Sequence, residues 1–144
     1  LEVVVKEGVN VKSKDKLYIG EGKRDQVKYI RSKISFDELT SYAKDVLDEV
    51  VNELVSKDEK RFVDFFNKSS ALTTRMHSLE LLPGIGKKHL WDIIAERKKK
   101  QFETFEEIKQ RITMVGDPKR MIIRRIMDEL QEKDRHQIFV SGIV

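Results

Sequence analysis

Cysteine is absent from this chain of 144 residues, which also contains only two prolines and one tryptophan. Without cysteine the chain cannot form a disulfide, a thiolate nucleophile or a cysteine-ligated zinc site. Its three histidines lack the spacing of metal ligands, and no segment approaches the roughly 18 consecutive apolar residues of a membrane-spanning helix. No charged and then apolar leader opens the sequence, so we expect neither a secreted nor a membrane protein.

Charged side chains, in contrast, are abundant at 38% of the residues, with a formal net charge of +4. Their distribution is uneven. Nine Lys and Arg stand against five Asp and Glu in residues 1–35, one against six in residues 36–55, and nineteen against fourteen in residues 56–144. Two basic blocks therefore flank an acidic one, which indicates two surfaces for an anionic partner and a solvated spacer between them.

The first 35 residues have the composition of β-strands. Residues 1–5, 17–19 and 27–30 are short β-branched or aromatic runs separated by turn residues. Three lysine-rich strands predict part of a small barrel, since a closed barrel of this kind needs about five strands. Because the chain starts with Leu1 rather than methionine, we expect the natural protein to begin earlier, and we expect the strand candidate at 137–140 to pair with the open barrel edge.

After Ser35 the sequence predicts helices. Capping-box patterns begin at Ser35, Ser56 and Thr104, and each precedes apolar residues at helical spacing. Breaks are expected at residues 67–70 and 115–118. Helices are predicted after Ser35 and after Ser56, and then at about 72–82, 87–98, 105–112 and 119–132.

The most informative segment joins two of these helices through Pro83-Gly-Ile-Gly86. Gly84 and Gly86 permit backbone conformations that are costly for other residues and leave room for a close ligand approach. The turn lies at the start of a helix, where free N–H groups and the helix dipole favour an anion. Lys87 and Lys88 add positive charge there, so the segment suits one backbone phosphate.

This segment resembles the helix-hairpin-helix motif of nucleic-acid-binding proteins, whose turn is an apolar residue followed by Pro-Gly-Ile/Val-Gly. The resemblance implies that Ile85 is buried and anchors the turn. Leu90 departs from the motif, which often has a small alanine there. Residues 104–132 are similar to a degenerate second copy around Val115-Gly-Asp-Pro118, although an ordinary helical hairpin explains them equally well.

The order of the parts is also similar to that of an archaeal protein family of unknown function described as predicted RNA-binding. The matching pieces are residues 17–25, 61–67, 73–86 and 102–108. The resemblance implies an archaeal cytoplasmic protein with an oligonucleotide-binding-like (OB-like) barrel, further helices and a helix-hairpin-helix region. It implies no catalytic residue.

An enzymatic interpretation finds little support. Lys88 is at the position where lyase-type helix-hairpin-helix DNA glycosylases place a catalytic lysine, but the aspartate that they need about 18–20 residues beyond the hairpin is missing, and Thr104 begins that stretch. His77 and His89 are expected to be packed or solvated, and Trp91 to lie in the core. We predict no enzyme activity, no catalytic residue, no metal site and no cofactor.

The sequence therefore predicts an α+β fold, in which a small partial OB-like β-barrel precedes an all-helical tandem helix-hairpin-helix domain. The expected parts are a barrel at 1–35, a helical connector at 36–70, the hairpin domain at 71–134 and a strand or tail at 135–144. The predicted function is sequence-independent binding of nucleic acid, with RNA favoured by the family resemblance alone; the alternative is a protein-docking adaptor. The predicted nucleic-acid contacts are Gly84, Ile85, Gly86, Lys87, Lys88, Lys98, Lys99, Lys100, Lys23 and Arg24, with Lys12, Lys14 and Lys16 beside the last two.

Overall fold

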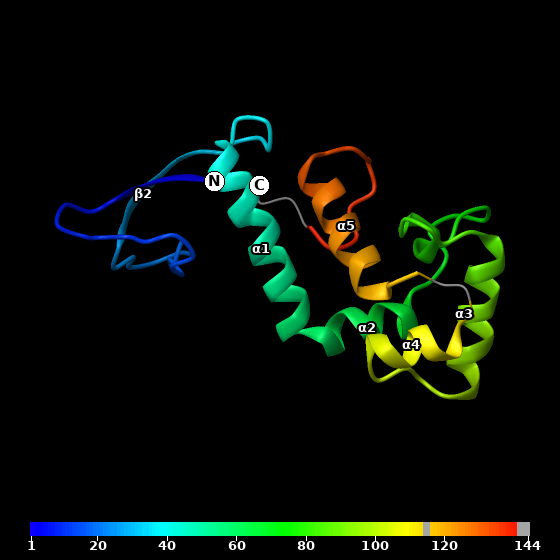
Figure 1. The fold of residues 1–144 in the computed structure, drawn as a ribbon. Helices are drawn as coiled ribbons and strands as arrows, with labels where there is room; N and C mark the ends of the chain where they lie inside the picture. Colours follow the sequence, from blue (N-terminus) through cyan, green and yellow to red (C-terminus); the bar gives the residue numbers. More distant parts are fainter. Residues whose placement is uncertain (114–115, 141–144) are drawn as a thin grey trace. The chain divides into compact units, whose positions relative to one another are not determined.

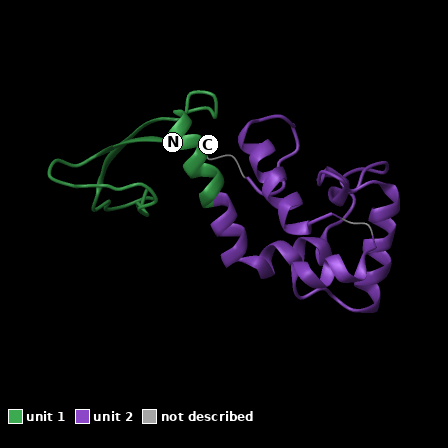
Figure 2. Ribbon diagram, in the orientation of Figure 1, with its two compact units in different colours: residues 1–50 green, residues 51–144 purple. Residues whose placement is uncertain are grey.

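A computed structural model describes residues 1–113 and 116–140 of the chain. The described residues form a two-stranded antiparallel sheet, five α-helices and one short 3-10 helix, a mixed α+β content (Figure 1). The chain divides into two compact units, residues 1–50 and 51–144, with the boundary inside helix α1 (Ser41–Lys57) (Figure 2). Among the described residues no helix has both the length and the apolar content needed to cross a bilayer.

The sheet of the first unit contains two strands rather than the three expected. Strand β1 (Glu2–Val5) pairs antiparallel with β2 (Val27–Ser32), and Val4 lies opposite Tyr29. The expected strand at residues 17–19 is wrong. Side chains satisfy the carbonyl groups of the segment that follows it, because Tyr18 Oη donates to Glu21 O at 2.9 Å and Arg24 Nε donates to Gly20 O at 2.9 Å. The segment therefore closes on itself locally instead of adding a strand.

Helix α1 begins at Ser41, five residues later than the sequence suggested. Both the backbone N–H and the hydroxyl of Ser35 donate to the Glu38 carboxylate at 2.7 Å. This hydroxyl is used as a donor, so it does not cap a helix, and residues 36–39 form an isolated turn. Thr40 is the actual cap, since its Oγ1 accepts from the Ala43 N–H at 3.1 Å.

The second unit packs short helices around one apolar core. They are α2 (Glu59–Lys68), the 3-10 helix η1 (Ser78–Leu81), α3 (Lys87–Lys99), α4 (Phe105–Arg111) and α5 (Pro118–Leu130). The capping box expected at Ser56 does not form: the Glu59 carboxylate instead accepts from the Phe105 N–H at 2.9 Å, which joins α2 to the start of α4. The most buried apolar side chains of the core are Val55, Val63, Phe66, Leu79, Leu82, Ile93, Ile108, Ile112 and Ile122.

Side chains from two helices tie α3 to α2. Arg97 of α3 donates to the carbonyl groups of Phe66 and Ser69 at 3.0 and 2.9 Å, where α2 ends. Asn67 of α2 forms two hydrogen bonds with the backbone of Phe102, both of 2.8 Å, in the loop after α3. These contacts satisfy the free carbonyl groups of the α2 end and fix the direction of α3 within the unit.

A helix over residues 72–82 was expected, but only the last turn of it exists. Residues 72–76 form a tight turn in which Thr73 Oγ1 accepts from the N–H groups of Arg75 and Met76. This local side-chain bond replaces helical hydrogen bonds. Ser78 anchors the following turn by donating, through both its N–H and its hydroxyl, to the Ser70 carbonyl. The helix before the hairpin is therefore the four-residue η1.

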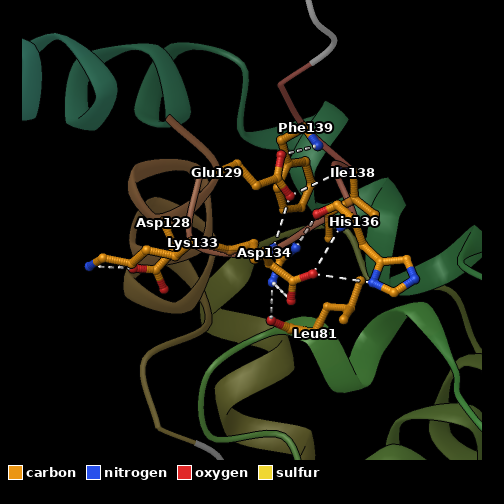
Figure 3. A network of polar contacts seen from close by, with 9 residues as sticks. Leu81, Asp128, Glu129, Lys133, Asp134, His136, Ile138 and Phe139 are labelled. Carbon is orange, nitrogen blue, oxygen red and sulfur yellow. Dashed lines mark hydrogen bonds and ion pairs between the residues drawn. The ribbon is translucent and has the colours of Figure 1, made fainter. Parts of the chain in front are cut away.

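The expected strand at residues 137–140 is also wrong, because a buried carboxylate binds this segment. Glu129 Oε1 and Oε2 accept from the N–H groups of Ile138 and Phe139 at 2.9 and 3.0 Å (Figure 3). Glu129 Oε2 also accepts from the Val140 N–H at 2.8 Å. Arg125 Nε donates to the same carboxylate at 2.9 Å. The ring of Phe139 then packs edge-on against Phe62 and Phe65. Three consecutive N–H groups on one side chain are unavailable to a neighbouring strand.

Candidate nucleic-acid interface

The turn between η1 and α3 has the geometry that its sequence indicates. Leu82 and Ile85 are buried, and the Ile85 N–H donates to the Leu82 carbonyl at 3.1 Å. Gly84 has φ +91°, and a Cβ there would lie 3.2 Å from Met121 Cε. The expected burial of Ile85 is confirmed, and Gly84 is a position where only glycine adopts the backbone conformation without strain.

Gly86 has a different role from the one expected. Its φ of −96° and ψ of −174° are ordinary extended values, and a Cβ there would have no neighbour within 4 Å. The prediction of a strained backbone at Gly86 is therefore wrong, whereas the space for close approach is present. As the N-cap of α3, Gly86 supplies no side-chain hydrogen bond. The first N–H groups of α3 thus have no side-chain cap.

The two lysines after Gly86 are not equivalent. Lys87 Nζ lies 2.7 Å from Glu80 Oε1 and 3.3 Å from the carbonyl oxygen of Arg75, so its charge is partly neutralised. Lys88 is exposed and makes no hydrogen bond or ion pair within the described residues. Lys88 is consequently the available cation beside the start of α3.

Glu80 links Lys87 to a capping box at the start of η1. Its other carboxylate oxygen accepts from the His77 N–H at 2.8 Å, while His77 Nδ1 accepts from the Leu79 N–H at 3.1 Å. The hydrogen bond from Lys87 lowers the pKa of the Glu80 carboxyl, and burial lowers the pKa of His77. His77 is therefore a packed, neutral cap at pH 7, in agreement with the structural role expected for it.

The other expected basic contacts on α3 are brought together only in part. Lys99 pairs with Glu96, and Lys100 Nζ lies 3.8 Å from Glu107 Oε1. Arg97, which precedes them, caps the end of α2. Within the described residues Lys98 alone of this run is exposed and unpaired. The basic run is thus largely used for packing the unit, which its sequence does not show.

The second hairpin begins differently from the first. Val115 lies outside the described residues, but Asp117 and the start of α5 are described. Asp117 Oδ1 accepts from the Lys119 N–H at 3.1 Å and caps α5. A carboxylate already occupies the place that an anion would take at this helix start. Within the described residues, a carboxylate therefore caps the start of α5, whereas the start of α3 has no side-chain cap.

Two arginines that the sequence analysis did not select lie beside the first hairpin. Arg120 and Arg124 of α5, with Asp117 and Met121, line an open pocket against Pro83 and Gly84. Both arginines are exposed and unpaired within the described part of the chain. The sequence signal that could have identified them is their spacing of four residues, which places both on one face of a helix. Together with Lys88 they surround the hairpin with positive charge.

Trp91 lies on the surface of α3, and its expected place in the core is wrong. It is 64% exposed, whereas Leu90 and Ile93 fill the core side of the same helix. Helical geometry explains the difference, because the residue after a buried one points about 100° away from it. The sequence contained this information in the alternation of apolar residues around position 91.

In the first unit, the expected contacts Lys23 and Arg24 differ in availability. Lys23 is exposed and unpaired among the described residues, while Arg24 is half-buried and bonded to the Gly20 carbonyl. Lys14 forms an ion pair with Glu49 at 2.6 Å. Lys12 and Lys16 are exposed. Of the cations expected as contacts in this unit, Lys12, Lys16 and Lys23 are thus available within the described residues.

Comparison with known proteins identifies a family, a relative and a solved structure that are similar to this chain. The model of the family described as "Protein of unknown function (DUF655)" matches residues 1–141. The uncharacterized protein MJ0038 of Methanocaldococcus jannaschii is 44% identical over 143 residues, or 98% of this chain, and this chain spans only 65% of its length. The crystal structure of Af1531 from Archaeoglobus fulgidus has a TM-score of 0.83 and 42% identity, covering 96% of this chain and 78% of that one. The resemblance to an archaeal family of unknown function is confirmed.

Proposed function

Because this chain belongs to the DUF655 family of proteins of unknown function, we propose its function from its own residues. It is a non-catalytic protein that binds the phosphate backbone of nucleic acid without sequence specificity, and RNA is its preferred partner. Residues 78–99 act as a helix-hairpin-helix in which η1 replaces the usual first helix. The observation that carries this proposal is the start of α3 at Gly86, where no side chain caps the helix.

The chemistry of this helix start favours a phosphate. The free N–H groups of the first turn and the positive end of the helix dipole attract an anion. The absence of any Cβ neighbour at Gly86 leaves room for a phosphate oxygen to approach the backbone. Lys88 adds a mobile cation that forms no ion pair or hydrogen bond within the described residues. Backbone donors contact phosphates but do not read bases, so the binding is expected to be independent of sequence.

Further positive charge extends this contact. Arg120 and Arg124 approach the turn at Pro83 and Gly84 and serve a second phosphate of the same strand. The first unit is proposed as the second binding surface, an OB-like partial barrel that uses Lys12, Lys16 and Lys23 on single-stranded or structured RNA. The preference for RNA rests on the family resemblance stated above.

The test is fluorescence anisotropy of the full chain with labelled 20-nucleotide RNA and DNA, single-stranded and duplex, between 50 and 300 mM KCl. We expect log K to fall linearly with log salt and to depend little on sequence, with a slope near −2 to −3 for about three phosphate contacts. The variant R120A/R124A should reduce the slope by about one, since both arginines serve one phosphate, and K109A, an exposed lysine on α4, should leave it unchanged. Absence of binding, or binding that does not respond to salt, would contradict the proposal and favour a protein-docking adaptor.

A further inference from the structure

Trp91 is the single tryptophan of the chain, and most of its side chain is in contact with solvent. Tryptophan is usually well buried in globular proteins because its side chain removes a large apolar area from water. The core side of α3 is already filled by Leu90 and Ile93. The indole therefore contributes little to the core, and its exposure needs a reason other than folding.

The surroundings of Trp91 on α3 are cationic. In a helix, Lys88 lies one turn before Trp91 on the same face, Ala95 one turn after it and Lys98 two turns after it. All three of these neighbours are exposed. Lys88 and Lys98 have no ion pair or hydrogen bond within the described residues. The small side chain of Ala95 leaves the indole uncovered toward Lys98.

We propose that Trp91 is a stacking platform for one unpaired nucleobase, with Lys88 and Lys98 contacting backbone phosphates before and after it along the strand. The inference rests on the proposed function and adds a base-contacting residue to it. Lys88 would then contact the phosphate bound at the hairpin, and this phosphate precedes the stacked nucleotide in the strand. Lys88 and Lys98 are separated by about 15 Å of helix rise, enough for a short stretch of single strand to lie between them.

Charge complementarity favours this occupant over a protein. The centre of a protein interface is depleted of lysine and surrounds its aromatic anchor with other apolar groups. Around Trp91 the exposed helix neighbours are Lys87, Lys88, Ala95 and Lys98, and of these lysines Lys88 and Lys98 are unpaired within the described residues. An aromatic side chain between cations is the arrangement by which proteins bind single strands without sequence preference, since every base offers a π face. A duplex keeps its bases stacked on one another and cannot use this platform.

The single tryptophan makes the test direct. The full chain is titrated with 12-nucleotide oligo(U) and oligo(dT) and with a 12-base-pair duplex, and both indole fluorescence and anisotropy are recorded. We expect saturable quenching by the single strands and none by the duplex. The variant W91A should lose about tenfold in affinity for the single strands and less than twofold for the duplex, because stacking contributes only to the former. W91F should retain most of the single-strand affinity.

The controls separate this inference from the proposed function. Y42A removes another exposed aromatic side chain, 67% exposed and in the first unit, and should not change the single-strand affinity. Circular dichroism and thermal melting check that W91A is folded. Single strands that bind without quenching and with equal affinity to W91A would overturn the role of Trp91 and leave the proposed function standing. If no nucleic acid binds, both the role of Trp91 and the proposed function are overturned. If the indole emission of the free protein shifts to the blue as its concentration rises, Trp91 serves self-association and the stacking role is overturned.

Discussion

Lys87 Nζ lies 2.7 Å from Glu80 Oε1, so the first lysine of α3 is bound to the segment that precedes the hairpin. Lys88, the next residue, has no such partner within the described residues. Adjacent lysines of identical chemistry therefore differ in what they can offer to a ligand. The difference arises because Glu80 also receives the His77 N–H and is held in place by it.

This asymmetry predicts unequal effects of two single substitutions. K88A should weaken binding of a 20-nucleotide RNA about three- to fivefold at 100 mM KCl and reduce the salt slope by about one, as expected for one lost phosphate contact. K87A should change both quantities by less than half as much. Anisotropy titrations at four salt concentrations measure both. Equal losses for the two variants would show that Lys87 leaves Glu80 when nucleic acid binds.

The two glycines of the hairpin provide a matched pair for stability. G84A places a side chain at φ +91° and 3.2 Å from Met121 Cε, so it should lower the free energy of unfolding by about 1–2 kcal/mol. G86A meets no atom within 4 Å at an ordinary φ, and its cost should stay below about 1 kcal/mol. Urea denaturation measures both. G86A should nevertheless weaken RNA binding, because its methyl group occupies the space open to a phosphate; unchanged affinity would argue against close approach at this position.

The buried carboxylate of Glu129 should be essential for stability. E129Q removes a charge that is paired with Arg125 and accepts three backbone N–H groups, and should cost about 3–5 kcal/mol, as for a broken buried ion pair. D128N is the control: Asp128 forms only a surface pair with Lys133, so its loss should cost less than about 1 kcal/mol. Urea denaturation gives both values, and limited proteolysis should cut E129Q first in residues 134–140. Equal stability of the two variants would refute this role of Glu129.

Acid should destabilise the fold in two stages. The folded-state pKa of His77 is lowered by burial from 6.5, so the folded state binds fewer protons than the unfolded state, and this contribution is lost as the pH falls below about 6.5. The pKa of Glu80 is lowered from 4.5 by the hydrogen bond from Lys87, so its contribution is lost below about 4.5. Both shifts have the same sign, and the free energy of unfolding should decrease from pH 7.5 to 4.

The contribution of His77 to the pH dependence of stability can be distinguished from that of the carboxylates by substituting His77. Protonation of Nδ1 removes the acceptor for the Leu79 N–H, whereas the asparagine of H77N accepts that bond at every pH. Urea midpoints are measured at pH 7.5, 6.0 and 4.5 for both proteins. The change in midpoint between pH 7.5 and pH 6.0 should be smaller in H77N than in the natural sequence. Parallel pH profiles for the two proteins would exclude His77 as the group that titrates.

Much of the helical part could be predicted from the sequence because its signals are local. Thr104 caps α4, Pro118 opens α5, and the periodic apolar residues before and after Gly86 indicate α3 and its buried side. The turn at Gly84 follows from residues that are adjacent in the chain, and the burial of Ile85 follows from the motif itself. Features of this kind are encoded within a few residues and need no knowledge of distant partners.

The tertiary structure decided everything that depends on a distant partner. The strand expected at 137–140 became a loop because the buried Glu129 carboxylate, which Arg125 holds, accepts from the N–H groups of residues 138–140. Arg97, which directly precedes the expected contacts Lys98, Lys99 and Lys100, caps α2 because α2 ends beside it. Lys87 and Lys88 are indistinguishable in sequence, and only the position of Glu80 separates them. Local capping and periodicity signals predict α3, α4 and α5, whereas the pairing of the charges is a consequence of how those helices pack.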